Sequence, residues 1–202
     1  MMPVPFPAEP LAGSVVRLEP LAEHHWPGIL AAGLHPELWT WTIDRIVDEA
    51  GLRTYFDAAR AAATEGREVP FATVDAASGE VVGSTRFGNL DADNRHVEIG
   101  WTWVTPSRQR TAVNTEAKYL MLRHAFEAWG CHRVELKTDV LNTCSRAAML
   151  RIGAREEGVF RSYQVRDDGR VRDTAWYAIT AHDWPEVRAG LERRLWQPPT
   201  AR

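Results

Sequence analysis

Residues 98–129, EIGWTWVTPSRQRTAVNTEAKYLMLRHAFEAW, decide the fold of this 202-residue chain. In residues 96–105, Ile99, Trp101 and Trp103 share one parity, and Glu98 lies with Gly100 and Thr102 on the other. This period of two predicts a strand with two different faces, which Pro106 ends. From Asn114 onward apolar residues recur every three or four positions, which predicts an amphipathic helix.

The loop between this strand and this helix contains two arginines, Arg108 and Arg110, among small polar residues. The sequence predicts a helix cap at Asn114 or Thr115. The first amides of a helix have no internal partner and the dipole there is positive, so such a loop is a suitable seat for phosphate. Many similar turns bind nothing, and the loop alone favours neither interpretation.

Downstream segments connect this loop to a known family. QRTAVN at residues 109–114 resembles the Gln/Arg-x-x-Gly-x-Gly/Ala loop with which GCN5-related N-acetyltransferases hold the pyrophosphate of acetyl-CoA, and TEA follows it at 115–117. NTCS at 142–145 and IGAREEG at 152–158 resemble segments of the branch that acetylates ribosomal-protein N-termini. The resemblance extends over residues 15–195. It implies a cofactor site made of Trp103, Val104, Gln109, Arg110, Thr111, Ala112, Val113, Asn114, Thr115, Asn142 and Ser145.

The loop departs from the family pattern at two positions. Ala112 stands where the family usually has glycine, and Asn114 stands where it has Gly or Ala. Alanine can replace glycine only where the backbone has the ordinary dihedral angles of a helix start. We therefore expect Ala112 to have such angles if the loop binds CoA.

Acetyl transfer needs a neutral amine, a stabilised oxyanion and a protonated leaving thiolate. Glu98 is the candidate base, with a structural carboxylate as an equally weighted alternative. The resemblance implies that a backbone amide near Trp103 and Val104 binds the oxyanion, that Ser145 protonates the thiolate and that Asn142 supports the pantetheine. For Asn142 and Ser145 the alternative is helix capping, and we favour function by about two to one.

Composition limits the other classes of function. The net charge of −3 indicates neither a nucleic-acid surface nor a membrane-attracted face. Cys131 and Cys144 form no disulfide framework, His24 and His25 lack the further ligands of a zinc site, and we expect no metal. The chain shows no signal peptide and no membrane-spanning stretch, so we expect it in the cytoplasm.

The remaining pattern predicts a single α+β domain over residues 13–196, between a proline-rich tail (1–12) and a C-terminal tail (197–202). We expect strands near residues 15–21, 68–75, 80–87, 132–138, 154–166 and 171–180, with helices near 23–32, 47–64, 142–152 and 183–195. The resemblance implies the acyl-CoA N-acyltransferase fold, a mixed, mostly antiparallel sheet in which strands 96–105 and 132–138 diverge around the pantetheine.

These features together predict an N-acetyltransferase that moves an acetyl group directly from acetyl-CoA to a primary amine. The acceptor is a protein N-terminus or a small molecule, and a homodimer is compatible with the sequence. Two alternatives stay open: transfer of succinyl or another acyl group, with Arg86 or Arg161 holding its carboxylate, and a non-catalytic acyl-CoA sensor. Trp39 and Trp41 are expected to cover the sheet rather than to shape a pocket. Asp173 and Tyr177 either face the acceptor or pair across the last hairpin.

Overall fold

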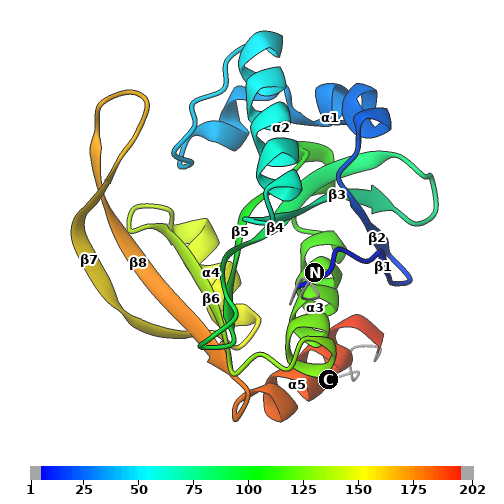
Figure 1. Ribbon diagram of the computed structural model, residues 1–202, viewed down its shortest axis with the longest axis vertical. Helices are drawn as coiled ribbons and strands as arrows, with labels where there is room; N and C mark the ends of the chain where they lie inside the picture. Colours follow the sequence, from blue (N-terminus) through cyan, green and yellow to red (C-terminus); the bar gives the residue numbers. More distant parts are fainter. Residues whose placement is uncertain (1–5, 197–202) are drawn as a thin grey trace, which may run out of the picture.

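The computed structural model describes residues 6–196, and the expected C-terminal tail at 197–202 lies outside the described residues. Eight strands form one sheet in the order β1-β2-β3-β4-β5-β6-β8-β7 (Figure 1). Every neighbouring pair is antiparallel except β5 and β6. The strands are β1 (Leu11–Ala12), β2 (Val16–Pro20), β3 (Val69–Asp75), β4 (Val81–Asp91), β5 (His96–Val104), β6 (Arg133–Asp139), β7 (Arg155–Val165) and β8 (Val171–Thr180). The predicted mixed, mostly antiparallel sheet is confirmed.

Helices cover both faces of this sheet. The five α-helices are α1 (Trp26–Gly33), α2 (Glu49–Thr64), α3 (Val113–Arg123), α4 (Thr143–Arg151) and α5 (Trp184–Trp196). Buried side chains of α1 and α2 form one apolar cluster, and those of α3 and α5 form a larger one with the strands. Figure 1 shows α1 and α2 on one side of the sheet, α3 and α5 on the other, and α4 beside β6. No helix within residues 6–196 is both long and apolar enough to span a bilayer.

Two boundaries differ from the expectation. Helix α3 begins at Val113 with Ala112 as its N-cap residue, so the predicted cap at Asn114 or Thr115 is wrong. The reason is that the helix starts without a capping side chain, which removes the signal that the prediction used. At the other end of the chain, Leu11–Ala12 pairs with β2 and Phe6 is buried, so residues from the expected tail join the sheet and the core.

Strand β5 contains a bulge at its centre. Ser84 of β4 pairs with Trp103 and Arg86 pairs with Gly100, so three residues of β5 span the same length as two of β4. Trp101 takes up the extra residue with a φ of +50°, in the left-handed region. Such a bulge reverses the alternation of the side chains that follow it.

The bulge changes which residues of β5 share a face. Ile99 and Thr102 face α3, whereas Trp103 packs into the cluster of α1 and α2. Glu98 pairs with Gly88, and the ring of Trp101 lies over the same glycine. The prediction that Glu98 lies opposite Trp101 and Trp103 is therefore wrong, because the inserted residue brings all three to the α1 and α2 face.

Helix α3 is fixed to the start of the sheet by a buried carboxylate. Glu116 is fully buried and accepts hydrogen bonds from the amides of Ser14 (3.0 Å), Val15 (2.6 Å) and Val16 (2.7 Å), and from the Ser14 hydroxyl (2.8 Å). Four donors to one ionised group compensate for its loss of water. Glu116 therefore holds the first turn of α3, and the loop before it, at a fixed position beside β2.

Candidate active site

Strands β5 and β6 pair over only three residues at the start of each strand. His96–Glu98 runs parallel to Arg133–Glu135, and beyond these residues β5 and β6 no longer pair. This agrees with the divergence that the sequence resemblance implies. Glu98 is the last residue of β5 that pairs with β6, so its side chain lies where the two strands separate.

The Glu98 carboxylate is buried and held by two side chains. It is 3% exposed, accepts a hydrogen bond from Asn89 Nδ2 at 2.5 Å and forms an ion pair with Lys137 Nζ at 2.7 Å. Burial raises the pKa of Glu98, while the charge and hydrogen bond of Lys137, followed by the bond from Asn89, act in the opposite direction. The environment thus suits a carboxyl group that can both lose and take up a proton.

A second buried lysine lies below the bulge on the α3 face. Lys118 is 6% exposed, and its Nζ contacts the hydroxyls of Thr102 at 2.5 Å and Thr85 at 3.3 Å. Within the described residues no carboxylate lies within 4.0 Å of this nitrogen. Burial lowers the pKa of Lys118 to about 7, against an opposing effect of the charge on Glu98. Burial thus favours the neutral amine at this position.

The backbone of the loop before α3 is ordinary at Ala112. Ala112 has φ −71° and ψ −13°, ordinary right-handed values that need no glycine. The residue in the left-handed region is Arg110, with φ +59°, and its side chain is exposed. Gln109 Nε2 donates to the Val104 carbonyl at 3.0 Å, and the Thr111 hydroxyl donates to the loop backbone. The Val113 amide donates to the Thr111 hydroxyl at 3.3 Å, and residues 105–113 include no acidic side chain.

Helix α4 carries the other two residues that the resemblance selects. Asn142 is the N-cap of α4, and its Oδ1 accepts a hydrogen bond from the Ser145 amide at 3.0 Å. Capping is therefore part of what Asn142 does, and its amide nitrogen and the half-buried Ser145 hydroxyl are not used in that bond. The structure brings this pair beside β6, the strand that leads away from Glu98.

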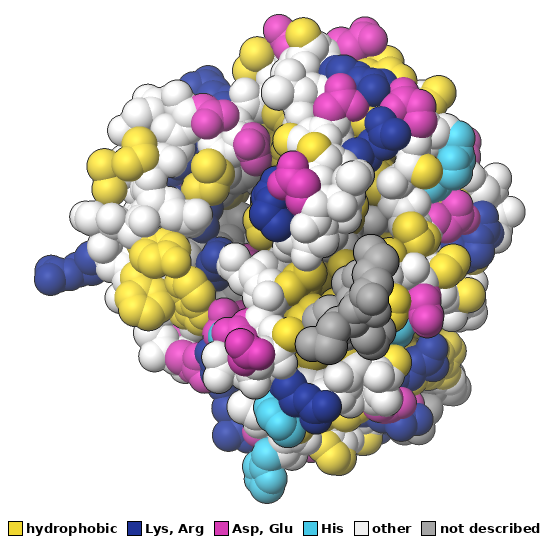
Figure 2. Space-filling model, in the orientation of Figure 1, with side chains coloured by type: hydrophobic (Ala, Val, Ile, Leu, Met, Phe, Trp, Pro, Cys, Tyr) yellow, Lys and Arg dark blue, Asp and Glu magenta, His cyan; other side chains and the backbone are white. Residues whose placement is uncertain are grey.

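A hollow lies at the turn between β4 and β5, beside β6, β7 and β8. A cavity of about 560 Å³ is lined by Asn89, Asp91, Glu135, Tyr163 and Trp176 together with their neighbours. Figure 2 shows an indentation between the part of the molecule formed by β7 and β8, on the left, and the rest. Two residues that line this cavity contact the ion pair: Asn89 bonds to Glu98, and Trp176 contacts Lys137.

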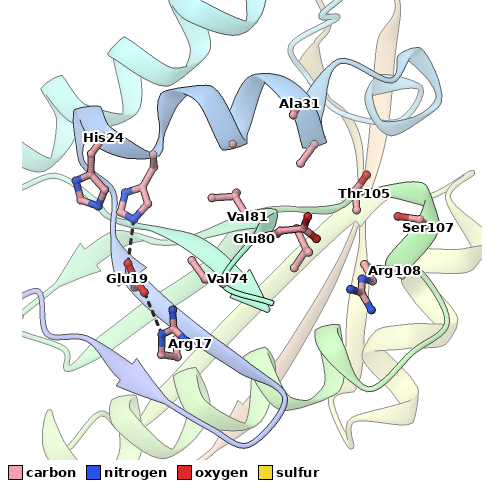
Figure 3. Close-up of a pocket in the computed structure, with 15 residues that line it drawn as sticks. Arg17, Glu19, His24, Ala31, Val74, Glu80, Val81, Thr105, Ser107 and Arg108 are labelled. Carbon is pink, nitrogen blue, oxygen red and sulfur yellow. Dashed lines mark hydrogen bonds and ion pairs between the residues drawn. The ribbon is translucent and has the colours of Figure 1, made fainter. Parts of the chain in front are cut away.

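Another cavity, of about 520 Å³, lies on the far side of the loop. It is enclosed by α1, β2 and the turn between β3 and β4, and Figure 3 shows Ser107 and Arg108 at one end of it. Its charged groups are largely paired, as in Arg17 with Glu19 at 3.1 Å and Arg108 with Asp75 at 3.4 Å. It does not reach the gap between β5 and β6.

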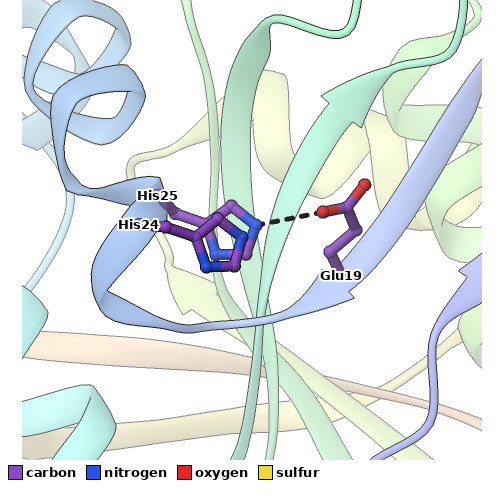
Figure 4. Close-up of side chains that lie close together, drawn as sticks. All are labelled: Glu19, His24 and His25. Carbon is purple, nitrogen blue, oxygen red and sulfur yellow. Dashed lines mark hydrogen bonds and ion pairs between the residues drawn. The ribbon is translucent and has the colours of Figure 1, made fainter.

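Glu19, His24 and His25 come close together at this second cavity (Figure 4). The sequence alone did not bring Glu19 near the two histidines. His25 Nδ1 accepts a hydrogen bond from the Ala22 amide at 3.1 Å, so the proton of the neutral ring is on Nε2, which lies 3.1 Å from Glu19. A neutral imidazole has one lone pair, and here the amide uses it. The cluster therefore supports the turn at Glu23–His25 and does not offer three metal ligands.

The residues whose roles the sequence left open have structural partners. Trp39 is 2% exposed in the α1 and α2 cluster, which confirms that it covers the sheet, and Trp41 is partly exposed. The Tyr177 hydroxyl lies between Arg146 and Glu156, and Asp173 accepts a hydrogen bond from the Ser162 amide across the last hairpin. These contacts favour pairing over an acceptor role.

The strand order, the gap between β5 and β6 and the loop before α3 define an N-acyltransferase fold. The family model described as the acetyltransferase (GNAT) domain matches residues 16–155, and the chain belongs to this family. A GCN5-related N-acetyltransferase from Brucella melitensis has a similar structure, with a TM-score of 0.86 and 31% identity over 96% of this chain and 87% of that chain. Mycobacterium smegmatis RimJ, solved in complex with CoA-disulfide, gives a TM-score of 0.72 and 32% identity over 92% of each chain.

A curated relative points in the same direction. "Putative ribosomal N-acetyltransferase YdaF" of Bacillus subtilis (strain 168) is 32% identical over 106 residues, which is 52% of this chain and 57% of that protein. The chain thus spans little more than half the length of this relative.

Lys118 and Lys137 are the site residues that the sequence analysis missed. Their contacts join segments far apart in the chain, so no local pattern reveals them. A signal was nevertheless present, because the sequence has 24 lysines and arginines and only these two are lysines.

Proposed function

We propose that this chain transfers an acetyl group from acetyl-CoA to a primary amine by direct attack in a ternary complex. The observation that carries the proposal is the buried Glu98 at the point where β5 and β6 separate. In this proposal the thioester lies in the gap beside the carboxylate, and the amine enters from the cavity lined by Asn89, which bonds to Glu98. CoA in the RimJ complex supports the choice of acyl donor.

The loop before α3 fits the pyrophosphate. The N-terminus of α3 carries a positive dipole, exposed Arg110 supplies a further positive charge, and the nearest acid of α3, Glu116, is bound to β2. Thr111, Asn114, Thr115 and Gln109 complete the proposed cradle. The Asn142 side chain would support the pantetheine arm.

Three groups then divide the chemistry. Glu98 accepts the proton of the incoming ammonium, and its raised pKa makes it a better base than an ordinary carboxylate. A backbone amide near Trp103 and Val104 binds the oxyanion, next to the bulge that shapes this part of β5. Ser145 returns a proton to the leaving thiolate. Since the amine of a protein N-terminus has an ordinary pKa near 8, a modest base suffices.

The two alternatives lose part of their motivation. Arg86 is paired with Glu68 at 2.9 Å and packs on Tyr55, so its charge is already balanced and a succinyl carboxylate would have to compete for it. The idea of a sensor rested on Ala112 and Asn114 in place of glycine and on the lack of a tyrosine in residues 142–152, and the ordinary helical dihedral angles of Ala112 remove the first of these grounds. Acetyl transfer is the simpler assignment.

Calorimetric titration with acetyl-CoA, CoA and succinyl-CoA tests the donor. We expect acetyl-CoA and CoA to bind with micromolar affinity and succinyl-CoA to bind no better than acetyl-CoA. A preference for succinyl-CoA would replace the acetyl donor, and failure of all three ligands to bind would refute the proposed function.

A further inference from the structure

Lysine is almost absent from this protein, and the two lysines it has lie at the candidate site. Lys118 and Lys137 are the only lysines among 24 basic side chains of the lysine and arginine type. Lysines usually lie on the surface, but Lys118 is 6% exposed and the Lys137 side chain is 14% exposed. An amine can lose its proton and act as a nucleophile, whereas the arginine guanidinium stays charged. The chain thus has an amine where the proposed reaction takes place.

Lys137 lies on β6 two residues beyond Glu135, the last residue of β6 that pairs with β5. Its side chain crosses toward β5, and its Nζ is 2.7 Å from Glu98 Oε2. On its other side it lies over the ring of Trp176 at 4.9 Å. Lys137 is therefore a primary ammonium in contact with the carboxylate that is proposed to deprotonate the substrate.

We propose that Lys137 is an internal acetyl acceptor and that the chain acetylates itself at this nitrogen when no external amine occupies the site. The inference rests on the proposed function. An acceptor amine must contact Glu98, and Lys137 already does so from its place over the Trp176 ring. Acetyl-CoA bound between β5 and β6 would have Lys137 as the nearest amine on the cavity side of the sheet.

The step balances without an added reactant. Glu98 takes one proton from the Lys137 ammonium, and the freed nitrogen forms a bond to the thioester carbonyl carbon. The carbon–sulfur bond breaks, and the CoA sulfur leaves with a second proton from the nitrogen. The products are N-acetyl-Lys137 and CoA. The modified side chain has no charge, so Glu98 loses its cation, and we expect the acetylated chain to act more slowly on external amines.

Lys118 provides an internal control because it is the other lysine of the chain and lies on the opposite face of β5. The protein is incubated with carbon-13-labelled acetyl-CoA, so that acetylation during expression is distinguished, and then digested with trypsin. Acetylation of Lys137 blocks tryptic cleavage after this residue, so residues 134–146 are recovered as one labelled peptide. Label on Lys118 joins residues 111–118 to 119–123 in the same way.

In the folded protein we expect at least tenfold more label on Lys137 than on Lys118, with a rate that saturates as acetyl-CoA increases. The heat-unfolded chain should label both lysines slowly and to similar extents, as chemical acetylation does. Glu98→Gln should reduce the label on Lys137 at least tenfold while leaving that on the unfolded chain unchanged. Equal labelling of the two lysines, or no excess over the unfolded chain, would overturn the proposal.

A parallel assay separates this proposal from the proposed function. Thiol release with external amines is measured on the same sample. If an amine is acetylated while Lys137 stays unlabelled, self-acetylation is refuted and the proposed function stands. If neither an external amine nor Lys137 is acetylated, both self-acetylation and the proposed function are refuted.

Discussion

Replacing Lys118 by methionine should stabilise the folded protein at neutral pH. Lys118 has no carboxylate partner within 4.0 Å in the described part of the chain, and its nitrogen contacts only the hydroxyls of Thr102 and Thr85. These hydroxyls also bond to each other at 2.8 Å, so both keep a partner when the lysine is removed. Methionine has a similar volume and is apolar, which suits a buried position.

The magnitude follows from the shift in the pKa of Lys118. The fall from 10.5 to about 7 means that the unfolded chain binds a proton that half of the folded molecules lack at pH 7. This difference costs the folded state about 4 kcal/mol at pH 7. Two lost hydrogen bonds cost the variant about 1 kcal/mol each. Lys118→Met should therefore raise the free energy of unfolding by about 2 kcal/mol.

The predicted direction of the stability change can be checked by measuring unfolding at different pH values. Between pH 7 and 10.5 the unfolded lysine stays protonated while the folded one is mostly neutral, so wild-type stability rises with pH, and below pH 7 the effect levels off. Urea unfolding at pH 7 and pH 9 should show the advantage of the variant shrinking by about 2 kcal/mol. Lys137→Met is the matched control, and it should destabilise by about 3 kcal/mol because it leaves Glu98 buried without its cation. A Lys118→Met protein that is less stable at pH 7, or whose advantage does not change with pH, would refute the reasoning.

Four further predictions follow from the same contacts. Glu116→Gln should lower the free energy of unfolding by about 3 kcal/mol in urea titrations, because four donors lose an ionised acceptor; an unchanged midpoint would contradict its anchoring role. Ala112→Asp should weaken acetyl-CoA binding at least tenfold, while Ala112→Asn keeps the affinity; equal affinities of the two variants would mean that phosphate binds elsewhere. Ser145→Ala should lower the turnover rate much more than the affinity for CoA, and equal losses would indicate a binding or structural role. Glu98→Gln should slow transfer and remove the acid limb of the pH profile, which the raised pKa of Glu98 places above the ordinary carboxyl range; an identical profile would exclude Glu98 as the base.

Most of the architecture could be predicted from local patterns. The period of two in residues 96–105 and the helical spacing over residues 114–129 identify β5 and α3. The end of β5 and the start of α3 each differ by one residue, whereas α3 ends at Arg123 and a π-helix continues over His124–Ala128. These signals depend only on which side chains are apolar and on where proline ends an element. These predictions are correct because the apolar faces that the periodicity identifies are the faces that neighbouring elements bury.

The bulge at Trp101 could not be predicted in the same way. It depends on a register against β4 that no residue of β5 encodes by itself, and the left-handed position is a tryptophan rather than the glycine that would signal it. For this reason alternation gave the wrong face for Glu98 relative to Trp103.

The charge network of the site was also hidden from local patterns. Glu98 and Lys137 are 39 residues apart and meet only because β6 lies beside β5. The balance between a base and a structural carboxylate at Glu98 therefore could not be judged from the sequence. The scarcity of lysine was visible in the sequence, and it would have identified Lys118 and Lys137 as candidate site residues.

The central claim is acetyl transfer to a primary amine, and thiol release tests it most directly. The protein is mixed with acetyl-CoA and a short peptide with a free N-terminus, with the same peptide N-acetylated as the matched control, and free CoA thiol is followed over time. We predict release that depends on the free amine and matches the amount of acetylated peptide found by mass spectrometry. Tight binding of acetyl-CoA with no release above the control for peptides, polyamines or amino-acid amines would contradict the account and leave a sensor of acyl-CoA.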